Sequence, residues 1–310
     1  ALKDFKCPRN LYYLTKSYFN DRTAFINSNN VQVETIVNKG CPQGSCSGPG
    51  YWNIQYNNLL NLEYVKNTKT IAFADDLIIA VRAETEAEAE NLMNMNIRKV
   101  TKWAKQNKTN FNENKSKAIL ISRRRKRRKT IDIYMNGERL EQVENIEYLG
   151  ITIDTRFTFN DHINKVSDKC IKLINALSKS ARIGWGLKHQ ALEIIYKGAI
   201  LPTLMYAAPV WIQSLEKKCN RDKYVRVQRL ILTRIAKAYR TISHEALCII
   251  TGITPIDIKA REVVALYNRK TGKRTTDRQI DLPEKPMNWL HPAEFLGTGD
   301  SNENAQWQIY

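Results

Sequence analysis

The chain has 310 residues, and its 49 Lys and Arg against 31 Asp and Glu give a formal net charge of +18. Its 43% of hydrophobic residues can bury a core, which argues against wholesale disorder. A surface this basic attracts polyanions, so nucleic acid is the first candidate partner; the alternative is a basic protein that simply stays soluble. The most apolar stretch, 198–212, contains Pro202 and Pro209 and is too short to span a bilayer, so no membrane partner is expected.

The first elements alternate between helical and extended patterns. Apolar spacing predicts a helix within 2–26, and alternation predicts a strand over 31–37. A block rich in Gly, Pro and Ser at 40–50 predicts turns and leads into a helix over 51–64. Two apolar runs, 70–74 and 77–81, then flank Asp75-Asp76, which predicts a β-hairpin with an acidic tip.

The next segment predicts a helix and further strands. Thr85 and Glu88 form a capping box ahead of a helix whose buried stripe includes Asn96, Val100 and Trp103. Strands are expected at 117–122, 131–135 and 146–153, with Asn136-Gly137 as a turn. The first half is therefore predicted to be α+β, a small and mostly antiparallel sheet with helices on one face.

After Asp154 the pattern becomes helical. Apolar residues recur at helical spacing over 163–177, 188–201 and 224–235, and a shorter helix over 243–250 ends at Gly252. From Thr271 the chain turns polar, which predicts a linker. The six cysteines include no Cys-x-x-Cys pair, so we expect reduced thiols in a cytosolic or nuclear protein.

The acidic tip is the clearest candidate site. Adjacent carboxylates repel each other unless a cation neutralises them, and Mg²⁺ takes carboxylate oxygens while leaving positions open for phosphate. In two-metal phosphoryl transfer, such ions activate a 3′ hydroxyl and steady the leaving pyrophosphate. The alternative is a solvated Asp-Asp turn.

Several sequence motifs occur one after another along the chain. They are Gly40 to Trp52, Phe73-Ala74-Asp75-Asp76, Phe111 to Lys117, Tyr148 to Asp154, Ala238 to Leu247 and Thr251 to Asp257. In this order they closely resemble the reverse transcriptases of non-long-terminal-repeat retrotransposons. The later phrases are most similar to the clade that inserts into ribosomal RNA genes, the R-one type of retrotransposable element.

The resemblance implies a right-hand polymerase that copies RNA into DNA from deoxynucleotide triphosphates with Mg²⁺ or Mn²⁺. It implies a partial palm at 1–157, a helical thumb at 158–270, and a linker at 271–310 leading toward a possible ribonuclease H domain. Asp75 would bind metal directly and Asp76 would be its partner. Gln43 and Gly44 would contact the nascent base pair, and Phe73 and Ala74 would lie under the primer end. Lys115 would donate a proton to the leaving pyrophosphate. Leu149 and Gly150 would form the turn that grips the primer strand.

These residues also have simpler interpretations. The glycines of the turn block could be turn punctuation alone, and Lys115 could be a solvated surface lysine. Trp52 is expected in the core, with stacking on a ligand as the alternative. Tyr148 and Leu149 could fill the core as well as grip the primer.

One metal ligand is expected to be missing. Family palms supply a further aspartate from an earlier strand, and neither Asp4 nor Asp21 is placed on a plausible buried strand. Ala1 is not an initiator Met, so we expect a piece of a longer polyprotein with its fingers and any endonuclease upstream. We therefore expect no polymerisation by this chain alone.

Two basic regions are candidates for contact with nucleic acid. Arg123, Arg124, Arg125, Lys126, Arg127, Arg128 and Lys129 form an uninterrupted run that is too self-repelling to pack. It could grip a phosphate backbone, act as a nuclear localisation patch, or be a tolerated insertion. The predicted helix over 221–240 carries many Lys and Arg that could line one face against a duplex. Tyr239 and Trp211 could stack on bases, although core packing is expected for each.

The leading hypothesis is an RNA-directed DNA polymerase fragment of a retrotransposon Pol polyprotein. In the intact protein the resemblance implies target-primed reverse transcription, with RNA as template, a nicked DNA end as primer, and residence in the nucleus after passage through the cytoplasm. The alternative is a non-catalytic RNA- or DNA-binding module derived from such an element. An intron-encoded maturase is a further rival, and the phrases over 241–257 argue against it.

Overall fold

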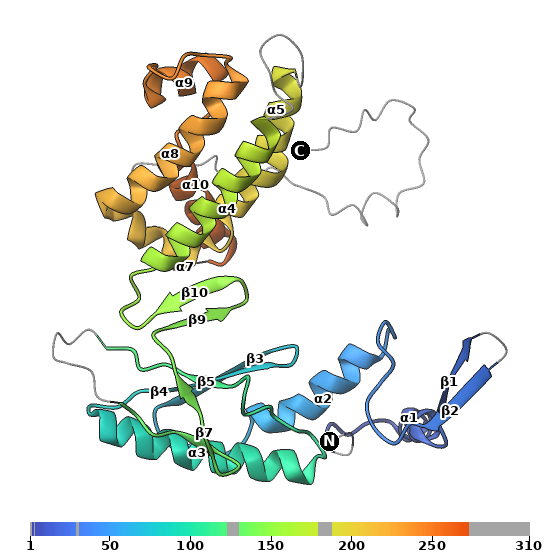
Figure 1. The fold of residues 1–310 in the computed structure, drawn as a ribbon. Coiled ribbons are helices and arrows are strands. Elements are labelled where there is room, and N and C mark those ends of the chain that lie inside the picture. Colours follow the sequence, from blue (N-terminus) through green and yellow to red (C-terminus); the bar gives the residue numbers. More distant parts are fainter. Residues whose placement is uncertain (1, 3, 29–30, 123–129, 179–187, 273–310) are drawn as a thin grey trace. The chain divides into compact units, whose positions relative to one another are not determined.

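The computed structural model describes residues 2, 4–28, 31–122, 130–178 and 188–272. They form two compact units, the first from residues up to 120 together with 130–143, and the second from 121–122 together with 144–272 (Figure 1). In the described ranges, no helix has both the length and the apolar character needed to cross a membrane.

The first unit mixes helices with short strand pairs. Its elements are α1 (Arg9–Phe19), β1 (Thr23–Ser28), β2 (Val31–Ile36), α2 (Gly48–Leu60), β3 (Thr68–Phe73), β4 (Asp76–Val81), α3 (Glu86–Gln106), β5 (Lys117–Ala118), β6 (Tyr134–Met135), β7 (Glu138–Arg139) and β8 (Glu141–Gln142). β1–β2, β3–β4 and β6–β7 pair antiparallel, and β5–β8 is parallel. The single small sheet that we expected is therefore wrong in detail, because the described strands form separate two-stranded ladders.

The expected helix over 2–26 is shorter in the structure. α1 ends at Phe19, and Asp21 then adopts a left-handed φ of 48°. The chain turns there and continues as β1, which pairs along its whole length with β2. Strand pairing therefore overrides helical spacing after Asn20, because residues 23–28 gain backbone partners from a segment that the local pattern does not reveal.

α3 forms as the sequence predicts. The Thr85 hydroxyl accepts the Glu88 N–H at 3.2 Å, and the Glu88 carboxylate accepts the N–H of Glu84 at 3.0 Å. Val100 and Trp103 on the predicted stripe are buried against Tyr56 and Leu59 of α2. Asn96 is also fully buried, where it accepts the Val65 N–H and donates to the Thr68 hydroxyl. This stripe fixes β3 and α2 against one face of α3.

The second unit begins with a hairpin. β9 (Asn145–Tyr148) and β10 (Ile151–Asp154) pair antiparallel around Leu149 and Gly150, so the single strand expected over 146–153 is wrong. Both turn residues have positive φ, 47° and 77°, which reverses the chain in two residues. Ile151 and Ile153 pack against the helical core, so the hairpin groups with the helices.

The helices of this unit surround one core. They are α4 (Asn160–Ser178), α5 (His189–Ile195), the π-helix η1 (Tyr196–Ile200), α6 (Leu201–Met205), α7 (Ala208–Trp211), the 3₁₀-helix η2 (Ile212–Glu216), α8 (Lys218–Ile235), α9 (His244–Thr251) and α10 (Ile256–Lys270). α4 packs along α8, and Ile163, Ile174 and Ile231 are fully buried. Trp211 is fully buried as expected, whereas the core position expected for Tyr239 is wrong, because its side chain is 84% exposed.

The predicted helices of the second half are confirmed. α9 is capped by the Ser243 hydroxyl, which accepts the Ala246 N–H, and it ends at Gly252 with a left-handed φ of 65°. The sequence did not lead us to expect α10, which follows Pro255 and runs to Lys270. The predicted linker lies outside the described residues after Gly272. The functional domains proposed at 1–157 and 158–270 stay a prediction, since the two compact units are defined by packing alone.

Candidate active site

The acidic hairpin is present and its turn is one residue earlier than expected. Phe73 faces Asp76 across the β3–β4 ladder, so Ala74 and Asp75 are the two turn residues and Asp76 begins β4. The side chains of all four residues are exposed. The two carboxylates therefore stand at the solvent-facing end of the hairpin, where a ligand can reach them.

Two aromatic side chains of α2 hold this turn from behind. The Trp52 indole N–H donates to the carbonyl oxygen of Ala74 at 2.7 Å, and the Tyr56 hydroxyl donates to that of Asp75 at 3.3 Å. The two rings pack on each other with centroids 4.5 Å apart, and Tyr56 is only 4% exposed. Burial first, and then the nearby charges of Asp75 and Asp76, raise the pKa of Tyr56 to about 12, so it remains a donor at neutral pH.

The backbone of the turn is strained. Ala74 adopts a left-handed φ of 51°. For a residue with a Cβ this conformation costs on the order of 1 kcal/mol of strain energy. The hydrogen bonds from Trp52 and Tyr56 offset this strain by fixing consecutive carbonyl groups. These two residues were not predicted as site residues, although their spacing of four on a helix that precedes the acidic hairpin is a visible signal.

The carboxylates of Asp75 and Asp76 are suitable ligands for a magnesium ion, but two carboxylates are too few for a complete two-metal site. Carboxylate oxygens are the ligands that Mg²⁺ prefers, and neither carboxylate is in an ion pair with a described residue. Within the described ranges, no group of three His, Cys, Asp or Glu side chains is placed to hold a metal. The pair could thus supply part of a metal site, and a two-metal centre needs further ligands.

The block before α2 forms a tight turn. Gly44 has a φ of 83°, the Ser45 N–H donates to the carbonyl of Pro42 at 3.2 Å, and the Ser45 hydroxyl accepts the N–H of Gly48 at 3.1 Å. Gln43 and Gly44 are exposed at this turn. They lie just before the helix that carries Trp52 and Tyr56, so α2 connects both predicted parts of the site.

The other predicted site residues are distant from the acidic hairpin in the sequence. Lys115 is exposed in a turn in which its backbone N–H donates to the Asn112 side chain at 3.1 Å. No hydrogen bond or ion pair between described residues joins its ammonium group to Asp75 or Asp76. Leu149 and Gly150 form the turn of the β9–β10 hairpin in the second unit, and both are exposed. Arg123 to Lys129 lie outside the described residues.

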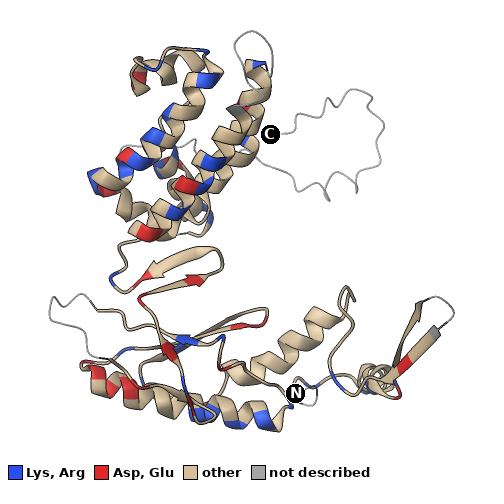
Figure 2. Cartoon of the chain, viewed as in Figure 1, with Lys and Arg blue, Asp and Glu red and all other residues tan. Residues whose placement is uncertain are grey.

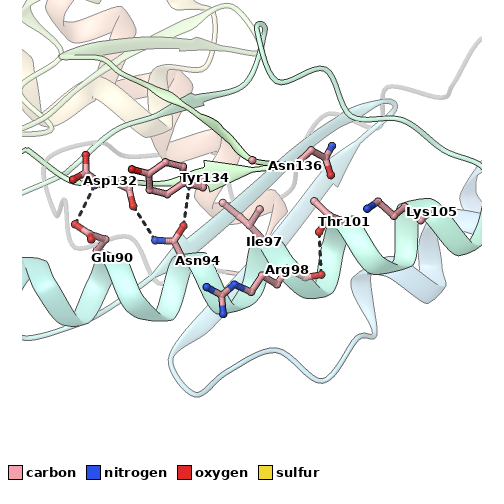
Figure 3. A pocket seen from close by; sticks show the side chains of 10 residues that line it. Glu90, Asn94, Ile97, Arg98, Thr101, Lys105, Asp132, Tyr134 and Asn136 are labelled. Carbon is pink, nitrogen blue, oxygen red and sulfur yellow. Dashed lines mark hydrogen bonds between the residues drawn. The ribbon is translucent and has the colours of Figure 1, made fainter.

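A cavity of about 450 Å³ beside α3 is not this site (Figure 3). Two of its polar side chains bind the neighbouring backbone: Glu90 accepts the Asp132 N–H, and Asn94 bridges Asp132 and Tyr134. Figure 3 shows these side chains reaching from α3 to the adjacent extended segment. The cavity therefore results from the attachment of residues 131–135 to α3.

Basic residues recur along α8 in the second unit, and Figure 2 shows their positions as blue segments of the ribbon of this helix. Several are occupied by the protein itself. Arg229 donates to the carbonyl oxygens of Arg240 and Ile242, and Arg234 donates to that of Leu230. Lys223 donates to Asn164 of α4. The predicted basic face is thus smaller than the sequence suggests, and Arg226 and Arg240 are among its exposed members.

Comparison with known proteins identifies the class. Residues 1–153, which contain the acidic hairpin and α2, match the family described as reverse transcriptase (RNA-dependent DNA polymerase). This segment belongs to the reverse transcriptase family. No solved structure matches the chain.

The curated relatives of the chain include proteins of type-1 retrotransposable elements. The chain is 31% identical over 286 residues to the "Putative 115 kDa protein in type-1 retrotransposable element R1DM" of Drosophila melanogaster, covering 91% of this chain and 26% of that protein. It is 28% identical over 248 residues to a Pol polyprotein from element R1 2 of Nasonia vitripennis, covering 78% and 60%. A Pol polyprotein from element R1 of Bradysia coprophila is 29% identical over 294 residues, covering 95% and 29%.

The chain is therefore a relative of R1 Pol polyproteins, and it spans between about a quarter and three fifths of their length. The resemblance inferred from the sequence motifs is confirmed. The alternative of a non-catalytic binding module is not favoured by these matches.

Proposed function

We propose that this chain is the palm and thumb portion of an RNA-directed DNA polymerase that acts within a retrotransposon Pol polyprotein. The observation that carries the proposal is the exposed Asp75-Asp76 pair on a strained turn held by Trp52 and Tyr56, inside the segment that matches the reverse transcriptase family. A solvated loop would not need two aromatic donors fixing consecutive carbonyl groups.

In this proposal the two carboxylates are oxygen ligands, with Asp75 binding directly and Asp76 assisting from the start of β4. Mg²⁺ or Mn²⁺ bound there would lower the pKa of the attacking 3′ hydroxyl and neutralise charge on the triphosphate. Trp52 and Tyr56 hold the backbone of the turn, so the two carboxylates would keep a fixed position when the triphosphate binds. Pre-set geometry of this kind lowers the barrier because the groups need not reorganise during the reaction.

The remaining roles follow the chain. Gln43 and Gly44 would lie beside the nascent base pair, and the absence of a side chain at Gly44 allows close approach of a base. Phe73 and Ala74 would support the primer end, and Lys115 would donate a proton to the leaving pyrophosphate. Leu149 and Gly150 would contact the primer strand, and the basic run Arg123 to Lys129 would contact a phosphate backbone. The substrates would be an RNA template, a DNA primer and deoxynucleotide triphosphates.

The whole polyprotein would carry out target-primed reverse transcription in the nucleus, together with an endonuclease domain. The test is primer extension on an RNA template by a polyprotein of the relatives' length that contains this chain. Asp75→Asn should lower the extension rate by at least about a hundredfold, because a metal ligand is lost. The matched control is Glu138→Gln, which neutralises an exposed carboxylate on β7 and should extend at the parental rate. Equal rates for both variants would overturn the proposal.

A further inference from the structure

The turn at Leu149 and Gly150 is held in an unfavourable conformation. Tyr148 and Ile151 pair directly across it, and both turn residues are left-handed, with φ of 47° and 77°. Glycine adopts this conformation freely, but leucine does not. Leu149 is also 37% exposed, so core packing does not account for its position. Something outside the hairpin must stabilise the turn.

Tyr206 supplies that support. Its hydroxyl donates to the carbonyl oxygen of Leu149 at 2.9 Å. Its ring also lies against Gly150, where an added Cβ would be 3.3 Å from the ring atom Cε1. The contact therefore fixes one peptide group of the turn by a hydrogen bond and the other by close packing.

The other end of Tyr206 is anchored in the helical core. Its carbonyl oxygen accepts the indole N–H of Trp211 at 2.8 Å, and Trp211 is fully buried. Ala207, the next residue, has a left-handed φ of 52°, so the backbone bends sharply between α6 and α7. Trp211, Tyr206 and the Leu149 turn thus form a continuous connection from the core to the solvent-facing end of the hairpin.

The turn has donors to offer to a ligand. Among the described residues, no protein acceptor receives the backbone N–H of Leu149 or of Gly150. Unpaired backbone N–H groups are common donors to phosphate oxygens of nucleic acids. Tyr206 is itself 54% exposed, so its hydroxyl could be satisfied by water. The contact of Tyr206 with the turn therefore keeps the N–H groups of Leu149 and Gly150 in one orientation, which water bound to the turn would not do.

We propose that Tyr206 is a positioning residue that orients the Leu149-Gly150 turn against the phosphates at the 3′ end of the primer strand. This inference rests on the proposed function, because it takes the turn as a primer contact. It assigns to a residue of the helical unit a part in placing the primer, which links the position of the primer end to the packing of α6 and α7.

The experiment uses the 310-residue chain and a DNA primer annealed to an RNA template, with binding followed by fluorescence anisotropy. A single uncharged methylphosphonate linkage is moved through the phosphates nearest the primer 3′ end. With the unmodified protein, one position should weaken binding by roughly two- to tenfold, the size of one lost hydrogen bond. With Tyr206→Phe, which removes only the hydroxyl, that position should lose its effect and all primers should bind with similarly reduced affinity.

Two controls separate positioning from folding. Tyr134→Phe removes an exposed hydroxyl from the first unit and should keep the position-specific loss. Thermal melting of Tyr206→Phe should match the unmodified chain within a few degrees.

A second variant tests the same contact from the side of the turn. Gly150→Ala, whose added Cβ would lie close to the Tyr206 ring at a positive φ, should abolish the position-specific loss in the same way as Tyr206→Phe.

The outcomes distinguish the inference from the function on which it rests. A position-specific loss that persists unchanged in Tyr206→Phe overturns the positioning role and leaves the turn as a primer contact. No position-specific loss in the unmodified chain, or no binding of the duplex, overturns the turn as a primer contact and the positioning role with it.

Discussion

The indole nitrogen of Trp52 lies 2.7 Å from the carbonyl oxygen of Ala74, and this hydrogen bond joins the middle of α2 to the turn that carries Asp75. Ala74 is in a left-handed conformation, so the bond acts on a strained peptide. Four residues further along the helix, Tyr56 makes the equivalent contact with Asp75 itself. α2 therefore determines where the two carboxylates stand.

Replacing Trp52 by Phe should loosen this turn without unfolding the protein. The ring that packs on Tyr56 is retained, and water can satisfy the exposed Ala74 carbonyl, so the free energy of unfolding should fall by no more than about 1 kcal/mol. Amide hydrogen exchange at Asp75 and Asp76 should become faster. Tyr134→Phe is the control, because it removes an exposed hydroxyl that bonds to neither Ala74 nor Asp75, and exchange at the turn should stay unchanged. Unchanged exchange in Trp52→Phe would show that the bond does not hold the turn.

Asp154 should be important for the stability of the second unit. Its carboxylate accepts the N–H groups of Arg156, Thr158 and Phe159 and the Thr158 hydroxyl, at the point where β10 leads into α4. Asp154→Asn replaces one accepting oxygen by a donor, so unfolding should become easier by about 1–3 kcal/mol. Urea denaturation followed by circular dichroism measures this. Asp161→Asn, on the first turn of α4, should cost less than about 1 kcal/mol.

The same carboxylate predicts acid sensitivity. Burial pushes the pKa of Asp154 upward, but the backbone and hydroxyl donors outweigh it and hold the pKa below its ordinary value. The stabilisation is complete above the ordinary Asp pKa of about 4 and is lost as the pH falls through the lower pKa of the folded state. The difference in unfolding free energy between the parent and Asp154→Asn should therefore shrink below about pH 4. A constant difference down to pH 2 would contradict this account.

His162 should make stability fall at mildly acidic pH. Its Nδ1 accepts the Thr152 N–H at 3.3 Å, which only the neutral ring can do. Burial first, and then the charge of Lys165, lower its pKa, while Glu147 acts in the opposite direction. Below the ordinary His pKa of about 6.5 the unfolded chain takes up a proton that the folded chain resists, so the free energy of unfolding should decrease from pH 7 to pH 5.

The measurement for His162 is chemical denaturation at pH 7 and pH 5. His162→Gln should show a smaller decrease than the parent. Some decrease should remain, because burial also lowers the pKa of His244 in the same unit. His189→Gln, at the start of α5, is the control and should keep the parental decrease.

The cap of α3 offers a test of the first unit. Thr85→Ala removes the hydroxyl that accepts the Glu88 N–H and should reduce the free energy of unfolding by about 1 kcal/mol. Thr101→Ala lies inside the same helix and should be neutral or slightly stabilising, because alanine has the higher helix propensity. Equal effects of the two substitutions would show that the cap does not contribute.

The run from Arg123 to Lys129 should set part of the salt dependence of nucleic-acid binding. Replacing its seven residues by Ala should reduce the slope of log affinity against log salt by about 0.9 for each phosphate that the run neutralises. Anisotropy with a labelled RNA–DNA duplex at several salt concentrations measures the slope. An unchanged slope would mean that the run does not contact the duplex.

Local patterns predicted much of this molecule. The capping box of α3, the Asn136-Gly137 turn and the end of α9 at Gly252 depend on neighbouring residues alone, and each is confirmed. The acidic hairpin was predicted within one residue, because apolar runs and a pair of aspartates are local signals as well.

What the sequence did not reveal depends on residues far apart in the chain. β1 becomes a strand only because β2 pairs with it, and the strand expected over 146–153 divides because Leu149 adopts a conformation that Tyr206 stabilises. Arg229 looked like a contact for nucleic acid, but in the structure its guanidinium holds the carbonyl oxygens of the loop after α8. The role of Trp52 in fixing Ala74 was missed for the same reason, since the hydrogen bond joins residues 22 apart and the spacing of Trp52 and Tyr56 on α2 does not by itself identify the turn as their partner.

The second compact unit includes the β9–β10 hairpin, whereas the segment matched by the reverse transcriptase family ends at residue 153. A truncation chosen from the family boundary would remove Ile151 and Ile153 from the helices on which they pack, and would separate the Thr152 N–H from His162. An expression boundary for the helical half therefore belongs before residue 144, so that the purified polypeptide retains the hairpin as its own first element.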